Sequence, residues 1–253
     1  MKEKTTEMND QKIDEYLKTL SLGHIVNIYQ QEADNAVKTK LSYQEYLLRL
    51  LEQQVLTKID RSINRRIQMA GFPQIRHLEE FDFSFQPQLN EKLLRELNGS
   101  LTFITDPRNI IFLGPPGVGK THLAIALGIK ACRMRRRVVF HTAEYLIQLL
   151  ASSELAGTLN KTLDDLARIE LLIIDELGYL EMTKKTATLF FQLVARRYER
   201  TSTIITSNKT FEEWGVIFQD DVVATAILDR LLHHCYPFYI QGKSYRMKNY
   251  LEK

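Results

Sequence analysis

Cysteine is scarce in this sequence: only Cys132 and Cys235 occur among 253 residues. Two cysteines cannot supply the network of disulfides that holds a small secreted scaffold together, so that class of protein is excluded. Both residues lie among apolar neighbours, which predicts buried thiols in a reducing compartment. We therefore expect a cytoplasmic protein.

Long apolar runs are lacking as well. No apolar stretch approaches the roughly 18 residues that would predict a membrane-spanning helix, so we expect no membrane partner. The first residues, Met1–Lys4, are of mixed charge and precede no apolar segment, so no signal peptide is predicted. With 44% hydrophobic and 26% charged residues, the composition fits one or two globular domains with a buried core. The net charge of +3 permits an anionic partner without requiring one.

Glycine and proline are almost missing from the beginning of the chain. Residues 1–70 contain Gly23 and no proline, and their apolar residues recur at helical spacing. Ser42 followed by Glu45 predicts a capping box at the start of a helix. We predict a small all-α N-terminal domain over residues 1–70 that contacts a partner or DNA. Its last helix is expected to end at Gly71 and Pro73.

The pattern changes after this helical region. Residues 71–95 are predicted to be a connector, in which alternating Phe81, Phe83 and Phe85 form either a strand or a strap packed on the next domain. In residues 96–253, short apolar runs alternate with longer helical segments, which predicts a parallel sheet with helices on both faces. The predicted strands are Asn109–Leu113, Arg137–His141, Leu171–Asp175, Ser202–Thr206 and Cys235–Ile240.

A phosphate-binding motif follows the first predicted strand. The pattern G-x-x-x-x-G-K-T is matched by Gly114–Thr121, and a helical run begins at His122. The glycines allow backbone N–H groups to surround phosphate oxygens at the positive end of a helix dipole. Lys120 is predicted to reach the β- and γ-phosphates, and Thr121 to ligate Mg²⁺, so we expect ATP and Mg²⁺ as ligands. The expected nucleotide-binding residues are Gly114, Pro115, Pro116, Gly117, Val118, Gly119, Lys120, Thr121, His122 and Asp175.

Two carboxylates, Asp175 and Glu176, follow the four apolar residues of the third predicted strand. Such an ending is common by itself, but after a phosphate loop it predicts that Asp175 holds Mg²⁺ together with Thr121. Glu176 is then expected to orient or deprotonate the attacking water. This favours hydrolysis over a P-loop kinase that transfers phosphate to an acceptor.

Two further polar residues complete the expected catalytic set of Glu176, Lys120, Asn208 and Arg230. If the fourth strand lies between the first and third, Asn208 emerges beside the γ-phosphate and helps position the water. The alternative is that Asn208 only turns the chain or caps a helix. Arg230, in a late helix, could stabilise transition-state charge on the nucleotide of a neighbouring subunit, or could be a surface residue paired with Asp229.

Together these motifs resemble the IstB-type transposition helper ATPases, whose wider relatives are the DnaC-type helicase loaders within the AAA+ superfamily. The resemblance spans about residues 40–250 and is carried by several segments. They are the phosphate loop with His122-Leu123-Ala124, Asp175–Leu180, Thr203–Asn208, Leu78–Phe83, Leu228–His234 and Gly242–Arg246.

The resemblance implies an α/β AAA+ core with a five-stranded parallel sheet and no C-terminal lid, since only 13 residues follow Ile240. It also implies an ATPase that forms an ATP- and DNA-dependent homo-oligomer on double-stranded DNA, deforms or marks the target, and recruits and stimulates a transposase. By the same resemblance, Asn208 would sense the γ-phosphate, Arg230 would act in trans, and Arg246 is only a weak substitute for a lid arginine. A DnaC-like replicative helicase loader is the alternative, and a DNA-binding adaptor with a vestigial ATP site is a further one.

Three segments are candidates for contact with DNA. Lys58, Arg61 and Arg65 fall on one helix face, and Arg133–Arg137 form a basic cluster. By the same resemblance, Ser152–Lys161 is a candidate for the extra helix that initiator-type relatives turn towards DNA. The sequence His233-His234-Cys235 is expected to be structural rather than a metal site, because no other ligand cluster accompanies it.

Overall fold

The computed structural model describes residues 2–179 and 181–247, with the side chains of residues 2–7 and 246 excepted. The chain divides into two compact units, Met1–Arg65 and Arg66–Lys253. Within the described residues, no helix is both long and apolar enough to cross a lipid bilayer.

The first unit consists of helices, as the sequence predicts. Its elements are α1 (Lys2–Thr19), α2 (Gly23–Thr39) and most of α3 (Tyr43–Ala70). The predicted capping box is confirmed: the backbone N–H of Ser42 donates to Glu45 Oε2 at 2.8 Å, and the Glu45 N–H donates to Ser42 Oγ at 3.2 Å. Helix α3 ends at Ala70, and Gly71 follows it with a φ of +77°, a conformation that favours glycine.

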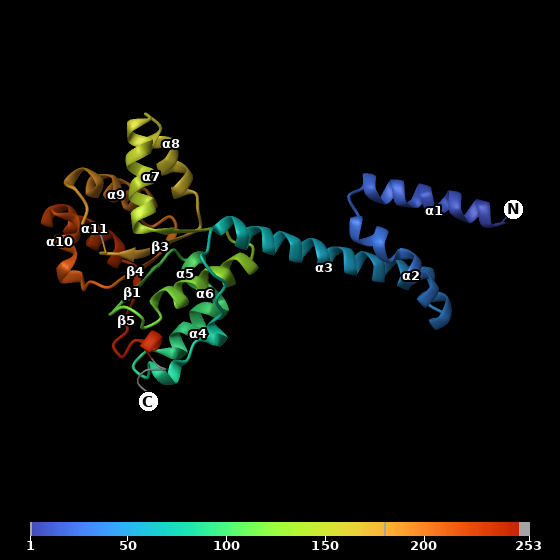
Figure 1. Cartoon of the computed structure of the whole chain (residues 1–253), viewed down its shortest axis with the longest axis horizontal. Helices are drawn as coiled ribbons and strands as arrows, with labels where there is room; N and C mark the ends of the chain where they lie inside the picture. Colours follow the sequence, from blue (N-terminus) through green and yellow to red (C-terminus); the bar gives the residue numbers. More distant parts are fainter. Residues whose placement is uncertain (1, 180, 248–253) are drawn as a thin grey trace. The chain divides into compact units, whose positions relative to one another are not determined.

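Five parallel strands form the centre of the second unit, in the order β2-β3-β4-β1-β5 (Figure 1). The prediction of a five-stranded parallel sheet is therefore confirmed. The strands are β1 (Asn109–Leu113), β2 (Val138–Thr142), β3 (Leu171–Leu177), β4 (Ser202–Ser207) and β5 (Cys235–Tyr239). Because β4 lies between β1 and β3, the carboxyl ends of these three strands meet at one edge of the sheet. Pro237, which has no N–H to donate, lies in the edge strand β5, where a proline is tolerated.

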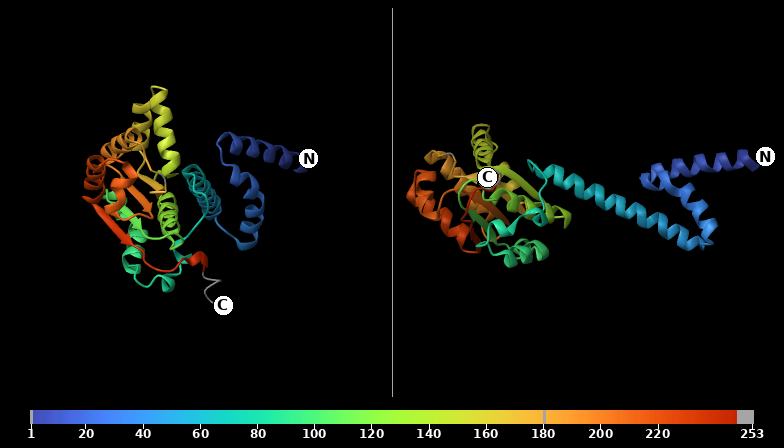
Figure 2. Two further views of the ribbon diagram at one scale, coloured as in Figure 1. Left: turned by 60° about the vertical axis from the view of Figure 1, so that its left-hand side comes forward. Right: turned by 60° about the horizontal axis from the view of Figure 1, so that its bottom comes forward.

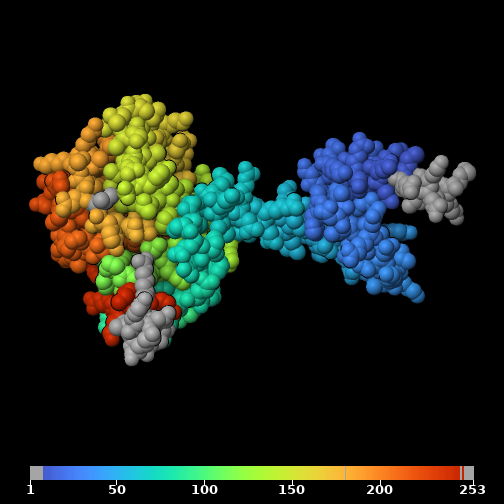
Figure 3. All heavy atoms as spheres, viewed as in Figure 1, coloured from blue at the N-terminus to red at the C-terminus, as the bar shows by residue number. Residues whose placement is uncertain are grey.

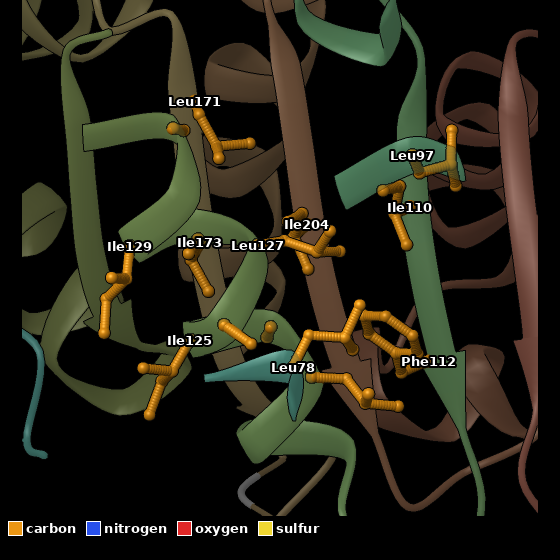
Figure 4. Close-up of a cluster of buried hydrophobic side chains, with 14 of the residues drawn as sticks. Leu78, Leu97, Ile110, Phe112, Ile125, Leu127, Ile129, Leu171, Ile173 and Ile204 are labelled. Carbon is orange, nitrogen blue, oxygen red and sulfur yellow. The ribbon is translucent and has the colours of Figure 1, made fainter. Parts of the chain in front are cut away.

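Helices cover both faces of this sheet (Figures 1 and 2). One face carries α4 (Glu91–Ser100), α5 (Thr102–Thr105) and α6 (Lys120–Arg133). The other carries α7 (Ala143–Leu155), α8 (Leu159–Ala167), α9 (Lys184–Arg197), α10 (Trp214–Phe218) and α11 (Asp221–Leu232). Strand β1 shows why both faces are apolar: Ile110 and Phe112 pack into the first layer, whereas Ile111 and Leu113 pack into the second. Figure 4 shows the first of these layers, with Phe112 and Ile204 facing Leu127 of α6.

The connector is a strap, and the alternative prediction of an extended strand is wrong. It contains two short 3₁₀ helices, η1 (Leu78–Glu80) and η2 (Phe83–Phe85). Leu78 is 2% exposed and belongs to the core under α6. In the space-filling view of Figure 3, the teal atoms of the connector lie directly against the rest of the second unit, to which the connector belongs.

The sequence predicts two buried thiols, which the structure confirms for Cys132 and only in part for Cys235. Cys132 is buried in α6 and Cys235 is half-buried at the start of β5. Loss of hydration on burial disfavours the thiolate, which raises the pKa of Cys132 to about 11 and that of Cys235 to about 12.

Candidate functional site: a phosphate loop at the end of the sheet

The phosphate loop connects the end of β1 to the start of α6, as predicted. Gly117 and Gly119 have φ angles of +81° and +100°, which only glycine adopts at little cost. A Cβ atom at Gly119 would lie 2.5 Å from the ring of Phe81, so this position also has no room for a side chain. The sharp path of the loop therefore depends on these two glycines.

Lys120 is buried at the first position of α6, with 8% of its surface exposed. Its ammonium donates to the carbonyl oxygens of Gly114 at 2.6 Å and Pro115 at 2.8 Å, both in the loop. The charged group is thus held directly over the backbone that would surround a phosphate. An ammonium in this position is suited to pairing with phosphate oxygens.

Asp175 is the centre of a hydrogen-bonded cluster behind the loop. The Thr121 hydroxyl lies 2.9 Å from Asp175 Oδ1 and 3.1 Å from Oδ2, and the Thr206 hydroxyl donates to Oδ1 at 2.5 Å. Asp175 is only 4% exposed, so both donors stabilise a carboxylate that has little contact with water. The two residues predicted to hold Mg²⁺, Thr121 and Asp175, are therefore adjacent.

Glu176 is displaced from the regular path of β3. The pairing of β3 with β4 shifts register between Ile174 and Leu177, and Glu176 has a φ of +63°. Its backbone N–H donates to the Thr206 hydroxyl at 3.0 Å, so Thr206 contacts both carboxylate residues. The bulge turns consecutive residues to different surroundings: Asp175 stays buried while the exposed Glu176 side chain lines the cavity.

Asn208 follows β4 and lies at the same edge of the sheet. It lines the cavity, and its side-chain oxygen is buried without a hydrogen-bond partner among the described residues. A buried acceptor of this kind is costly unless a ligand or water donates to it. The turn that the alternative interpretation predicted is also present, because the Lys209 N–H donates to Ser207 Oγ at 3.1 Å.

These groups surround a cavity of about 230 Å³. Predicted residues on its walls are Pro116, Gly117, Val118, Gly119, Lys120, Thr121, His122, Glu176 and Asn208. For a second set of wall residues the sequence analysis predicts no role in the site: Gln74, Arg76, Glu80, Asp82 and Gln86 from the connector, and Tyr179, Thr206, Ser207 and Tyr245. Phe81 and Phe85, for which the sequence predicts packing or, in the alternative, a position bordering the adenine, also line it. Gly114 and Pro115 lie at the base of the loop, and Asp175 lies behind Thr121.

His122 fixes the connector to the first turn of α6. Its Nε2 lies 2.8 Å from the carbonyl oxygen of His77, and its ring packs edge-on against Phe81 with centroids 5.4 Å apart. A carbonyl can only accept, so Nε2 carries the proton and donates. Burial lowers the pKa of His122 by more than the hydrogen bond to the His77 carbonyl raises it, and the positive charge of Arg76 also lowers it.

Arg230 is the one predicted catalytic residue that the fold does not bring to this cavity. It lies near the end of α11, where its guanidinium donates to the Ala226 carbonyl at 2.8 Å and sits 4.8 Å from the centre of the Phe191 ring. Among the described side chains, no ion pair joins Arg230 to Asp229, so the surface-pair alternative is wrong in that respect. The side chain of Arg246 lies outside the described residues.

The candidate DNA-contacting segments are placed as follows. Lys58, Arg61 and Arg65 are exposed on α3. Arg136 and Arg137 pair with Glu170, Arg136 at 3.0 Å, so part of the second cluster is neutralised within the unit.

Ser152–Lys161 is not a single helix, contrary to the prediction. It spans the end of α7, a turn at Gly157 and the start of α8. Gly157 has a φ of +70°, which interrupts the helix there.

His233 and His234 have a neighbour that their sequence spacing did not reveal. Glu199 Oε1 lies 3.4 Å from His233 Nδ1 and 3.6 Å from His234 Nε2. His233 Nδ1 is also 2.8 Å from the Tyr198 hydroxyl, so His233 already has a hydrogen-bond partner within the chain.

The residues around the cavity fit a nucleoside triphosphate and a divalent cation. The loop backbone and Lys120 are suited to phosphate, and the hydroxyl of Thr121 with the carboxylate of Asp175 supplies the oxygen donors that Mg²⁺ prefers. The buried oxygen of Asn208 at the same edge has no hydrogen-bond partner among the described residues and can accept one from a ligand or water. Sheet order and site together define a P-loop nucleotide-binding protein.

Comparison with known proteins identifies the family. The chain belongs to the IstB-like ATP-binding proteins, whose family pattern it matches over residues 15–253. It is 45% identical over 232 residues to an ATP-binding protein named for insertion sequence IS21 of Pseudomonas aeruginosa, covering 92% of this chain and 87% of that one. It is 43% identical to the corresponding protein of insertion sequence IS5376 from Geobacillus stearothermophilus, over 94% of both chains.

Solved structures agree on the fold. AMPPCP-bound DnaA from Aquifex aeolicus superimposes with a TM-score of 0.57 and 22% identity, covering 72% of this chain and 55% of that one. The DnaC helicase loader superimposes with a TM-score of 0.52 and 21% identity, covering 69% of this chain and 98% of that one. The chain is thus an IstB-like ATP-binding protein with the fold of DnaA and of the DnaC helicase loader, and the relatives reported above are named for insertion sequences.

Proposed function

We propose that this protein is a Mg²⁺-dependent ATPase that assembles on double-stranded DNA in its ATP-bound form and recruits and stimulates a transposase. The observation that carries the proposal is the meeting of Lys120, Thr121, Glu176 and Asn208 at one cavity, with Asp175 directly behind them. A site meant only to bind ATP would not need a carboxylate turned into the cavity by a β-bulge. Membership of an insertion-sequence family supports the link to transposition.

The roles of the side chains follow from their positions. Bound Mg²⁺ would neutralise charge on the phosphates, held by Thr121 and Asp175. Glu176 accepts a proton from water as the water oxygen attacks the γ-phosphorus and the bond to the bridging oxygen breaks, giving ADP and phosphate. Asn208 Oδ1 accepts a hydrogen bond from the same water and orients it, while Lys120 stabilises negative charge on the phosphate oxygens.

Arg230 would complete the site of a neighbouring copy. Within its own chain it lies on α11 against Phe191, away from the cavity walls. An arginine that supplies transition-state stabilisation must reach the γ-phosphate, so in this arrangement it acts in trans. Activity would then require an oligomer.

Exposed basic residues support contact with DNA. Lys58, Arg61 and Arg65 share a face of α3 at helical spacing and are exposed. A few phosphate contacts per subunit give modest affinity, but they add up when many copies bind one duplex. Assembly on DNA would therefore depend on the ATP-driven association of subunits.

The test is ATP hydrolysis by wild type and by Glu176→Gln, each with and without duplex DNA. The proposal predicts DNA-stimulated hydrolysis in wild type and a loss of about 100-fold or more in the variant, with ATP binding retained. Glu96→Gln is the matched control, because Glu96 is exposed on α4 and lines no part of the cavity. Full hydrolysis by Glu176→Gln would overturn the assignment. Capture of a transposase by the ATP-bound protein would support the proposed function, whereas capture of a replicative helicase would indicate a helicase loader.

A further inference from the structure

The end of the described chain crosses the phosphate loop. We call residues 241–247 the tail strap. The N–H of Ile240, just before it, donates to the Leu113 carbonyl at 2.8 Å, and the N–H of Tyr245 donates to the Gly117 carbonyl at 2.9 Å. A side chain at Gly117 would collide with Ser244. The tail strap is therefore packed on the loop backbone and becomes part of the nucleotide cavity, which Tyr245 lines.

Gln86 of the connector is held by this tail strap. It is 3% exposed, and its Nε2 donates to the Lys243 carbonyl at 3.4 Å. Because a carbonyl only accepts, this contact assigns the amide nitrogen to the Lys243 side and leaves Oε1 as a separate acceptor. Gly242 makes room for that oxygen: a Cβ atom there would lie 2.6 Å from Oε1.

The oxygen of this amide has no donor in the described part of the chain. Gln86 Oε1 is fully buried and unpartnered, although Gln86 lines the cavity. Leaving such an acceptor unsatisfied is costly, and buried amides in folded proteins almost always have a partner. Asn208 also lines this cavity and has a buried, unpartnered amide oxygen, but it follows β4, beside the catalytic carboxylates. The two oxygens therefore belong to different walls, one catalytic and one formed by the connector and tail strap.

The wall around Gln86 is aromatic. Phe85 and Tyr245 are in edge-to-face contact with ring centroids 5.2 Å apart, and both line the cavity. Phe81, which packs on Gly119, also lines it. A planar, largely apolar base is stabilised by contact with such rings, whereas phosphates are not. Phosphate-binding groups on one wall and aromatic groups with a buried acceptor on another match the two ends of a nucleotide.

We infer that Gln86 selects the base of the nucleotide by accepting a hydrogen bond from the 6-amino group of adenine. Guanine has a carbonyl oxygen at that position, so two acceptors would face each other and the Gln86 oxygen would remain unsatisfied. The inference rests on the ATP-binding role given above and adds which residue distinguishes adenine. Loss of one such hydrogen bond is expected to change affinity about tenfold.

The test removes the hydrogen bond between adenine and Gln86 in two ways, by changing the nucleotide and by changing the protein. Displacement of a fluorescent ATP analogue is measured for ATP, for GTP and for purine riboside triphosphate, which lacks the 6-amino group. Wild type is predicted to bind ATP about tenfold more tightly than purine riboside triphosphate, and Gln86→Met is predicted to bind the two equally. Gln88→Met, at an exposed position two residues along, is the matched control and should retain the tenfold preference.

Gly242→Ala tests the same contact while leaving Gln86 itself unsubstituted. The added methyl group would displace Gln86 Oε1, so this variant should also lose the preference for ATP. If both variants keep the tenfold preference, or if wild type binds the two triphosphates equally, the inference is refuted while ATP binding stands. Failure of wild type to bind any of the three would instead contradict the proposed function itself.

Discussion

Thr206 is the residue whose removal tests the structural account of the site most sharply. Its hydroxyl donates to Asp175 at 2.5 Å and accepts from the Glu176 backbone at 3.0 Å, and its exposed fraction is 1%. Valine has nearly the same shape, so Thr206→Val removes these two hydrogen bonds with little change in packing. The variant therefore measures how much the bulge at Glu176 depends on one hydroxyl.

The expected loss of stability is about 2–4.5 kcal/mol. A hydrogen bond to a buried carboxylate contributes about 1.5–3 kcal/mol, and one between neutral groups about 0.5–1.5 kcal/mol. The free energy of unfolding is measured by urea denaturation followed by circular dichroism. In hydrolysis assays, kcat should fall by about tenfold or more, because Glu176 is no longer held in position, while KM for ATP stays nearly constant.

Thr188→Val provides the matched control. Thr188 is exposed on α9 and its hydroxyl bonds to the Lys184 carbonyl of the same helix, so the loss of stability should be within about 0.5 kcal/mol. A loss in Thr206→Val no larger than that of the control, together with unchanged kcat, would refute the idea that Thr206 supports both carboxylate residues.

Three other perturbations test separate parts of the structure. Gly119→Ala should weaken binding of a fluorescent ATP analogue by about tenfold or more, since the new Cβ would meet Phe81 and the φ of +100° is strained for alanine. Arg230→Ala and Lys120→Ala should each abolish hydrolysis, but an equal mixture should recover about a quarter of wild-type turnover, because half of the subunits offer an intact loop and half of their neighbours an intact arginine. Burial lowers the pKa of His122, so on acidification the unfolded chain takes up a proton at this residue before the folded protein does. The free energy of unfolding should therefore fall as the pH drops below about 6.5. Over the same pH range, the urea midpoint of His122→Gln should fall less than that of wild type.

Each of these has a result that would contradict it. Normal nucleotide affinity in Gly119→Ala would show that the loop can shift away from the connector. An inactive mixture of the two alanine variants, with mixed oligomers demonstrated by light scattering, would remove the argument for action in trans. Equal pH dependence of wild type and His122→Gln would mean that other groups account for the loss of stability in acid.

The sequence was sufficient to predict the core of the fold and the phosphate end of the site. Apolar runs such as Leu171–Ile174 can be stable only as buried strands, and the glycine pattern around Lys120 requires one particular loop. Since parallel strands end at the same edge, Asp175, Glu176 and Asn208 could be brought together from strand order alone.

The remaining walls of the cavity depend on tertiary contacts that leave no local pattern. Gln86 contacts Lys243, which lies 157 positions further along the chain, and Gln86 belongs to no recognisable motif. The aromatic alternation around Phe83 resembles a strand, yet packing under α6 favours two 3₁₀ turns instead. Thr206 carried a visible signal, a polar residue within an apolar strand, but its role is evident only when β3 and β4 are side by side.

The most direct test of the central claim is the size of the Glu176→Gln protein on duplex DNA, measured by light scattering with ATP and with ADP. Because this variant should bind ATP without cleaving it, the account predicts a large, lasting assembly on DNA with ATP and dissociation to small species with ADP. A particle of the same small size with either nucleotide would contradict the claim that ATP binding drives assembly on DNA.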